Sequence, residues 1–242
     1  MPVHLCFDFG NTRLKCGVFR DGQFAEEKIL PAGDVAAVAE LVQSYHPDKA
    51  ILSSVINHPE AIETYLATHT RFHKLSHHSR LPVTTPVGKP ETIGSDRLAL
   101  VSAAAMLFPG HHTLAIGLGT CITFNYTNHL HQFLGGSISP GMQMRFRAMH
   151  EQTALLPEIT PDMIFPLVGY DTRTNLLSGV ILGMAKEIDG IIGEYGKKYR
   201  NCKAMITGGD LHFLLPHLEQ AVHAEPYLLY KGLLAICEHN LP

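Results

Sequence analysis

The sequence predicts an α/β protein of two related domains, each with a mixed sheet flanked by helices. Residues 3–9 form an apolar, strand-forming run that leads through a polar turn into a second run at 14–19, which indicates a β-hairpin. Helical and strand patterns then alternate to about residue 109. A strand, a Gly-rich turn and a further strand recur at 112–126, about one domain's length after the first copy.

The first domain is expected to begin with three consecutive antiparallel strands. Gly10 and Asn11 are expected to supply unusual backbone angles in the first turn. The further elements expected in this domain are a strand at 23–29, a helix at 36–45, strands at 49–55 and 72–75, and a helix at 59–68. A Pro-rich loop at 79–93 then leads to a helix at 98–108, for which Ser95 or Asp96 is the expected N-cap.

The dipeptide Pro109-Gly110 predicts a domain boundary, which divides the chain into residues 1–109 and 110–242. The second domain is expected to hold strands at 112–116, 121–126, 132–138 and 204–207 and helices at 142–150, 172–195 and 227–239. Asp171 or Thr172 is the expected cap of the long helix. Within it, Gly179 and Gly183 indicate close helix contact or close approach of a ligand.

Composition narrows the class of protein. The chain has 242 residues, 45% hydrophobic and 17% charged, and a net charge of −3, which gives no electrostatic footprint for nucleic acid or an anionic membrane. Its five cysteines include no C-x-x-C pair, so we expect reduced thiols in a cytoplasmic protein. No window approaches the roughly 18 apolar residues of a membrane span, so a soluble protein is expected.

Two polar stretches are candidates for chemistry. Asp8, at the end of the first strand, can hold a hydrated Mg²⁺ beside a turn whose amides and hydroxyls bind an anion, and Lys15 adds a positive charge on the same side. The alternative is a plain hairpin with an acidic corner. Asp96 followed by Arg97 offers a base and a carboxylate-binding fork, although Asp96 alone would also suit a helix N-terminus. The chain lacks the G-x-x-x-x-G-K-[ST] of a P-loop.

Seven stretches in order resemble the type III pantothenate kinase family of the acetate-and-sugar-kinase/actin superfamily. They are D-F-G-N-T-R-L-K (8–15), G-S-D-R (94–97), G-T-C-I-T (119–123), G-G-S-I-S-P-G (135–141), T-A-L-L-P (153–157), T-G-G-D (207–210) and K-G-L (231–233). Each is weak alone, but their order and spacing are specific. The resemblance implies two actin-like (ribonuclease H-like) domains. It also implies ATP-dependent phosphorylation of pantothenate to 4'-phosphopantothenate, the first step of coenzyme A synthesis.

The resemblance also implies roles for individual residues. Asp96 would be the general base that accepts the proton of the pantothenate hydroxyl, and Arg97 would bind the substrate. Asp8 would orient Mg²⁺ through water, and Lys15 would offset the charge of the phosphates. Further substrate contacts would come from Gly94 and Ser95, and from Thr172 through the interface of a homodimer. The remaining ATP contacts would come from Gly10, Asn11, Thr12, Gly119, Thr120, Gly208 and Gly209.

Three positions depart from the family pattern. Gly117 stands where an Asp usually begins the second phosphate motif, and Asn125 replaces another common Asp. Both changes put the family's monovalent cation, K⁺ or NH₄⁺, in question, because an amide keeps an oxygen ligand but loses a charge. Val87 replaces a tyrosine that usually lines the pantothenate site.

The departures support two alternatives. One is a non-catalytic nucleotide-binding or regulatory relative, which Gly117 and Asn125 favour. The other is a kinase of a different small hydroxy compound, which Val87 favours. Because Asp8, Lys15, Asp96 and Arg97 are all present, an active kinase is the preferred interpretation. A purely structural protein would require seven ordered motifs to be coincidence.

Overall fold

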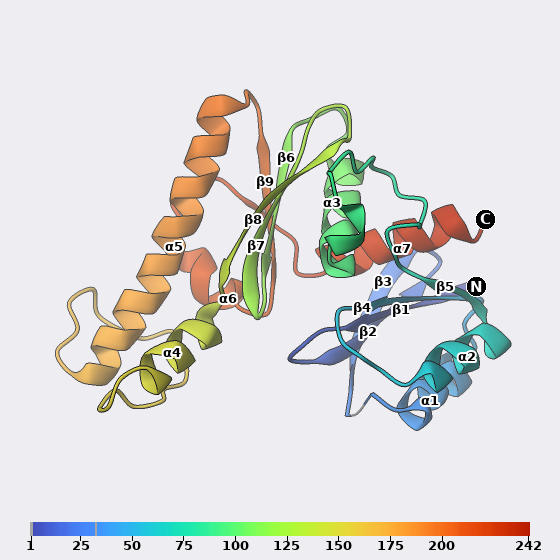
Figure 1. Cartoon of the computed structure of the whole chain (residues 1–242), viewed down its shortest axis with the longest axis horizontal. Coiled ribbons are helices and arrows are strands. Elements are labelled where there is room, and N and C mark those ends of the chain that lie inside the picture. Colours follow the sequence, from blue (N-terminus) through green and yellow to red (C-terminus); the bar gives the residue numbers. More distant parts are fainter. Residues whose placement is uncertain (1, 32) are drawn as a thin grey trace. The chain divides into compact units, whose positions relative to one another are not determined.

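The computed structural model describes residues 2–31 and 33–242, which form two compact units. The first unit comprises residues up to 109 together with 131–133 and 228–242, and the second comprises 110–130 and 134–227 (Figure 1). One change of unit therefore falls at the expected boundary. The last helix, which we expected in the domain 110–242, groups instead with the first unit, because its apolar side packs on that unit's sheet.

The first unit carries its elements in the expected order. They are β1 (Val3–Phe9), β2 (Leu14–Arg20), β3 (Gln23–Leu30), α1 (Val35–Tyr45), β4 (Lys49–Ser54), α2 (Glu60–His69), β5 (Arg71–Lys74), the 3-10 helix η1 (Pro90–Thr92), α3 (Ser95–Leu107) and α7 (Leu228–Asn240). The strands form one five-stranded sheet in the order β3-β2-β1-β4-β5. β1 pairs antiparallel with β2 and parallel with β4, so the sheet is mixed.

Alternation along β1 divides the first unit into two cores, one on each face of the sheet. Leu5, Phe7 and Phe9 pack with apolar residues of α1 and α2. Cys6, between them, faces the other way and packs with residues of α3 and α7, the helices on the opposite face of this sheet from α1 and α2 (Figure 1). Asp8, two residues after Cys6, therefore lies on the sheet face that α3 and α7 cover.

The second unit repeats the strand order of the first. Its elements are β6 (Thr113–Leu118), β7 (Cys121–Thr127), β8 (Phe133–Pro140), α4 (Met142–Glu151), α5 (Thr172–Lys198), β9 (Lys203–Gly208), α6 (Leu211–Leu214), the 3-10 helix η2 (Leu215–His217) and β10 (His223–Ala224). The sheet order β8-β7-β6-β9-β10 matches β3-β2-β1-β4-β5 strand for strand. β6 likewise pairs antiparallel with β7 and parallel with β9. The internal repeat in the sequence thus corresponds to a repeated topology.

The core of the second unit lies between its sheet and the helices α4 and α5. Leu114, Ile116 and Phe124 pack against Met142 of α4 and Ile181 of α5. Asp171 caps α5 through a capping box with Thr174. Although α5 is 27 residues long, no helix in the described part of the chain has both the length and the apolar character needed to cross a membrane.

Three local expectations need correction. Neither Gly10 nor Asn11 is among the residues with positive φ, because the Gly10 N–H donates to the Arg13 carbonyl in a four-residue turn that needs no left-handed residue. The N-cap of α3 is Gly94, and Ser95 and Asp96 are the first helical residues. Cβ atoms on Gly179 and Gly183 would meet no atom of the described residues within 4 Å, so close helix contact within this part of the chain is not their role, and the approach of a ligand stays a prediction.

Candidate active site

The candidate site begins with a row of polar side chains across three neighbouring strands. Lys15 of β2 is paired in register with Asp8 of β1, and Asp8 is paired with Ser53 of β4. Residues paired in register project from the same face of a sheet. Lys15, Asp8 and Ser53 therefore form a row on the face that α3 and α7 cover. We call these three residues the polar row.

Ser53 connects the polar row to the first turn of α3. Its hydroxyl lies 2.9 Å from the hydroxyl of Ser95, and Ser95 Oγ donates to the Ser54 carbonyl at 3.2 Å. Because Ser95 uses its proton on that carbonyl, Ser53 is the donor between the two hydroxyls. Both serines are buried. The N-terminus of α3 is thus fixed against the end of β4, one residue before Asp96.

Asp96 and Asp8 lie close enough to influence each other electrostatically. Burial, and after it the negative charge of Asp96, raises the pKa of Asp8 to about 7, although Lys15 opposes the shift. Burial also raises the pKa of Asp96, although hydrogen bonds from backbone N–H groups and the positive charge of Arg97 act to lower it. Two acidic side chains with raised pKa values, one near a strand end and one at a helix start, are therefore candidates for holding a cation and for accepting a proton.

Arg97 is held beside Asp96 by an aromatic ring. Its guanidinium carbon lies 5.6 Å from the ring centroid of Phe133, one of the three residues 131–133 that belong to the first unit. Burial lowers the pKa of Arg97, while the charge of Asp96 opposes the shift. A guanidinium so placed remains charged and can bind a carboxylate with two hydrogen bonds.

A cavity of about 390 Å³ opens beside the start of α3. Its wall is mixed polar and apolar, and Val87 does not line it. The lining residues are Ser54, Val55, Leu75, Ser76, His77, Glu91, Thr92, Ile93, Gly94, Ser95 and Leu98. This volume is at the small end of ligand-binding cavities, and it is bordered by two of the four residues of the G-S-D-R motif.

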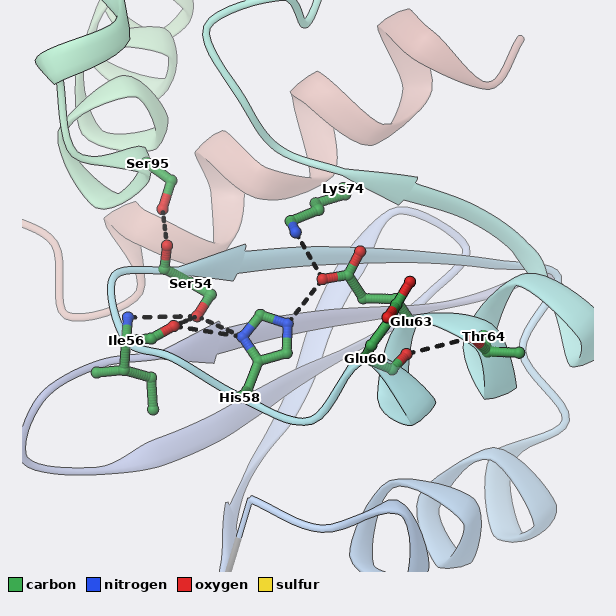
Figure 2. Close-up of polar contacts among 8 residues, drawn as sticks. All are labelled: Ser54, Ile56, His58, Glu60, Glu63, Thr64, Lys74 and Ser95. Carbon is green, nitrogen blue, oxygen red and sulfur yellow. Dashed lines mark hydrogen bonds and ion pairs between the residues drawn. The ribbon is translucent and has the colours of Figure 1, made fainter.

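A partly buried histidine contacts Ser54, one of the residues that line this cavity (Figure 2). His58 Nδ1 lies 3.0 Å from the hydroxyl of Ser54, and His58 Nε2 lies 2.9 Å from the carboxylate of Glu63. Lys74 donates to the same Glu63 oxygen at 2.6 Å. Since the Ser54 carbonyl holds Ser95, the chain of contacts from Lys74 through Glu63 and His58 ends at the first turn of α3.

Lys15 has a partner outside the motif that contains it. Its ammonium group lies 3.3 Å from Glu27 Oε2, and the hydroxyl of Tyr230 in α7 donates to the same oxygen at 2.8 Å. Burial, and then the hydrogen bond to Glu27, raises the pKa of Tyr230 well above its ordinary value, so its hydroxyl acts as a donor. The last helix thus contacts the polar row through one carboxylate.

The turn from residue 10 to 13 lies at the end of the hairpin that carries Asp8 and Lys15. Asn11 and Thr12 are exposed, and Gly10 is partly exposed. Asn11 and Thr12 can therefore be reached by an anion at the same end of the sheet as the polar row, whereas the Gly10 N–H is bonded to the Arg13 carbonyl.

In the second unit, the two predicted glycine motifs lie side by side at the C-terminal ends of the neighbouring strands β6 and β9. β6 and β9 are parallel neighbours, with Leu118 paired to Gly208, so Gly119 and Gly209 follow directly at adjacent strand ends. Gly119, Thr120, Gly208 and Gly209 are all exposed. A Cβ on Gly208 would lie 2.1 Å from the Leu118 carbonyl oxygen, whereas a Cβ on Gly209 would meet nothing within 4 Å. Gly208 is therefore required by strand packing, and Gly209 leaves open space.

Thr172 and Asn125 lie elsewhere in the second unit. Thr172 is the exposed first residue of α5. Asn125 is fully buried in β7, where its amide nitrogen donates to the Ala115 carbonyl at 3.0 Å and to the Thr123 hydroxyl at 3.1 Å. An aspartate would place oxygen against that carbonyl, so the asparagine fits its surroundings as a donor.

Five residues that the sequence interpretation did not select contribute to the first unit's site. Ser53 is the last residue but one of β4, and its place in the polar row depends on the parallel pairing of β1 with β4. Glu27, Tyr230, His58 and Glu63 act through contacts between residues distant in sequence. For Ser53, the position at the carboxyl end of a predicted strand was a usable signal; the other four carried none.

The repeated topology of the two units defines an actin-like α/β fold, with a polar hairpin and a carboxylate at a helix start in one unit and a second glycine turn in the other. Similar overall folds support this class. A conserved protein from Campylobacter jejuni described as a Baf family transcriptional activator has a TM-score of 0.61 and 20% identity, with 98% of each chain covered. A glucokinase from an Antarctic psychrotroph has a TM-score of 0.53 and 9% identity over 98% of this chain and 99% of that one. These likenesses establish the fold alone.

Sequence comparison identifies the family. The family model described as type III pantothenate kinase matches residues 4–194. The type III pantothenate kinase of Christiangramia forsetii is 36% identical over 240 residues, which cover 98% of this chain and 99% of that protein. That of Cytophaga hutchinsonii is 35% identical over 239 residues, with 99% and 100% covered. The chain belongs to the type III pantothenate kinase family.

Proposed function

We propose that this chain transfers the γ-phosphate of ATP to the primary hydroxyl of pantothenate. The acceptor oxygen forms the new O–P bond, its proton passes to Asp96, and ADP leaves with the electrons of the broken bond. The observation that supports this most directly is that Asp8 lies in a polar row whose Ser53 contacts Ser95, the residue before Asp96, and that the charge of Asp96 raises the pKa of Asp8. A base and a phosphate-binding end of a sheet are thereby next to each other.

The cavity beside α3 is the proposed acceptor site. Gly94 and Ser95 border it, and Asp96 follows them in the same turn. Arg97, held by Phe133, is suited to the carboxylate of pantothenate. Val87 lies outside the lining of this cavity, so the absence of the family's tyrosine at this position leaves the proposed site intact.

The hairpin is the proposed phosphate site. Asn11 and Thr12 are exposed in this turn and are proposed to contact phosphate oxygens together with the partly exposed Gly10, and Lys15 supplies positive charge. In the other unit, Gly119, Thr120, Gly208 and Gly209 are proposed to contact ATP, with the open space beside Gly209 admitting the adenosine.

Asp8 fits a role as the Mg²⁺ ligand. A partly buried carboxylate whose pKa is raised to about 7, mainly by burial, gains from a neighbouring cation. A single carboxylate is the usual protein contribution to a Mg²⁺ ion that also binds water and substrate phosphates. When bound, the ion would neutralise charge on the transferred phosphate.

We further propose that the reaction needs no K⁺ or NH₄⁺. Gly117 has no side chain to offer a cation, and Asn125 lacks the negative charge of the aspartate that is common in the family. Equal rates of phosphorylation in K⁺, NH₄⁺ and Na⁺ salts are the expected result. A rate that depends on K⁺ or NH₄⁺ would contradict this assignment.

The active form is proposed to be a cytoplasmic homodimer. Thr172 is exposed at the start of α5, and the glycines at 179 and 183 leave open space on that helix, which suits the close approach of a second copy. The five cysteines are free thiols, which suits a reducing compartment. Thr172 would then contact the substrate of the partner.

The test is a coupled assay of ADP release with pantothenate as acceptor. Wild-type chain is expected to turn over, and Asp96→Asn to lose at least about 100-fold in kcat while still binding an ATP analogue. Nucleotide binding without turnover of any acceptor would support a regulatory relative. Turnover with another hydroxy compound but not pantothenate would change the substrate. Full activity of Asp96→Asn would exclude Asp96 as the base.

A further inference from the structure

Strand β3 carries two clusters of tyrosine, glutamate and lysine, one on each face of the sheet. In the first, Glu27 accepts a hydrogen bond from Tyr230 at 2.8 Å and pairs with Lys15 at 3.3 Å. In the second, Glu26 accepts a hydrogen bond from Tyr45 of α1, also at 2.8 Å, and pairs with Lys28. The two clusters are chemically alike, but only the first contains a member of the polar row.

The first cluster is fixed by close packing. A Cβ on Gly17 would lie 2.7 Å from the ring of Tyr230, so the ring rests directly on the backbone of β2. Phe24 stacks on the same ring with centroids 5.8 Å apart. A Cβ on Gly232 would lie 1.9 Å from the Ala99 carbonyl oxygen, so α7 crosses α3 at minimal distance. These contacts leave Tyr230 only 4% exposed.

The second cluster is more exposed than the first. The side chains of Lys28 and Glu26 are 41% and 39% exposed, against 24% and 28% for Lys15 and Glu27. Exposed ion pairs contribute little because water and salt screen them. The cluster around Glu27 is therefore better able to hold a lysine in one place.

We propose that Glu27 and Tyr230 are positioning residues for Lys15: α7 holds Glu27 through the Tyr230 hydroxyl, and Glu27 holds the ammonium group of Lys15 beside Asp8. This inference rests on the proposed function, in which that ammonium group contacts the phosphates of ATP. A lysine side chain is long and flexible, and ordering it in advance removes an entropy loss that nucleotide binding would otherwise incur. Tyr230 lies beyond residues 4–194, which the family model matches.

The experiment compares Tyr230→Phe with Tyr45→Phe in the full chain. Each variant removes one hydroxyl from one cluster and leaves the ring. We expect Tyr230→Phe to lower kcat/KM for ATP about tenfold, the usual effect of losing a hydrogen bond to a charged group. The KM for pantothenate and the melting temperature are expected to remain close to wild type. Tyr45→Phe is expected to match wild type in all of these measurements.

A double mutant tests whether Tyr230 acts through Glu27. Adding Tyr230→Phe to Glu27→Gln is expected to cause no further loss, whereas independent roles would give additive losses. Glu26→Gln is the matched control for Glu27→Gln. Additive losses, equal effects of the two tyrosine variants, or a rise in both KM values together with a lower melting temperature would each overturn the proposal.

A binding measurement separates this inference from the proposed function. Calorimetric affinity for a non-hydrolysable ATP analogue with Mg²⁺ requires no acceptor. Weaker binding by Tyr230→Phe but not Tyr45→Phe would uphold the positioning role even if pantothenate were not the substrate. Turnover of pantothenate by wild type with unchanged kcat/KM and analogue affinity in Tyr230→Phe would overturn the inference alone.

Discussion

A Cβ atom on Gly94 would lie 2.5 Å from the Oδ1 atom of Asp96. No real Cβ occupies such a position, so either the backbone or the carboxylate would have to move. The carboxylate is the end of a flexible side chain and moves at little cost. Gly94 therefore leaves the space in which the Asp96 carboxylate folds back over the helix start.

Gly94→Ala is expected to displace the Asp96 carboxylate without unfolding the protein. We expect kcat for pantothenate phosphorylation to fall by about tenfold to 100-fold, because a misplaced base loses much of its contribution. The melting temperature is expected to change little. Gly88→Ala, at a loop glycine whose Cβ would meet nothing within 4 Å, is the control. Unchanged kcat in Gly94→Ala would show that the carboxylate works equally well elsewhere.

Glu63→Gln is expected to impair the acceptor site more than the nucleotide site. The substitution removes the charge that holds His58 and Lys74, and His58 in turn supports Ser54 in the cavity wall. We expect the KM for pantothenate to rise about fivefold to tenfold, with the KM for ATP nearly unchanged. Steady-state kinetics with each substrate varied would measure the difference.

The control for this prediction lies on the same helix. Glu60 is exposed in the first turn of α2, where Thr64 donates only to its backbone carbonyl (Figure 2). Glu60→Gln should therefore behave as wild type. Equal increases in both KM values for Glu63→Gln would assign the contact chain to general stability instead of the acceptor site.

The two neighbouring glycines at the end of β9 are expected to respond differently to alanine. Gly208 has a φ of +118°, and its Cβ would lie 2.1 Å from the Leu118 carbonyl. Gly208→Ala is expected to destabilise the protein by about 3 kcal/mol or more. Gly209→Ala should retain the melting temperature and weaken ATP binding if the adenosine occupies the open space there. Thermal unfolding and calorimetry with an ATP analogue would separate the two effects, and a stable Gly208→Ala variant would refute the first.

The raised pKa of Asp8 should make the free energy of unfolding of the ligand-free, metal-free protein depend on pH. An unfolded aspartate titrates near pH 3.9, whereas burial, followed by Asp96, raises the pKa of Asp8 to about 7 in the folded protein. Between these values the folded state binds the additional proton. The contribution of Asp8 to the free energy of unfolding therefore falls as pH rises from about 4 to about 7.

Asp8→Asn should remove this dependence. Below pH 4 this effect should leave the free energy of unfolding of the variant equal to that of wild type. At pH 8 the variant is expected to be more stable by about 2 kcal/mol. This gain is smaller than the full pKa shift implies, because the side chain is only partly buried. Chemical denaturation across the pH range would measure the difference curve. Asp21→Asn, at an exposed turn, is the control. A difference curve that is flat from pH 4 to 8 would contradict the assigned burial effect.

The strands and helices were largely predictable because their signals are local. The hairpin of β1 and β2 follows from two alternating apolar runs, and the capping of α5 by Asp171 follows from a polar residue before a periodic stretch. The N-cap of α3 was misassigned to Ser95 or Asp96, since both suit a cap by type. Here Ser95 is bound to the end of β4, and this tertiary contact has no signature in local sequence.

Of the candidate site, only the residues that belong to short sequence motifs were predictable. Asp8, Lys15, Asp96 and Arg97 stand in short patterns, and the structure brings Asp8 and Asp96 within electrostatic reach. Ser53 and Glu27 join them through strand pairing, and Tyr230 through a helix more than two hundred residues from Lys15. The location of α7 was not predictable, because an amphipathic helix can pack on either sheet and the choice depends on Gly17 and Gly232 leaving space.

The return of α7 to the first unit has a consequence for how the chain matures during translation. A ribosome releases residues up to 109 early, yet of the two helices that cover the sheet face bearing Asp8, only α3 is present until residues 228–240 emerge. The whole second unit, which lies between them in sequence, is synthesised in the interval. Nascent chains arrested before α7 should therefore lack the Tyr230 contact to Glu27, so that the ordering of Lys15 has to wait for the synthesis of α7.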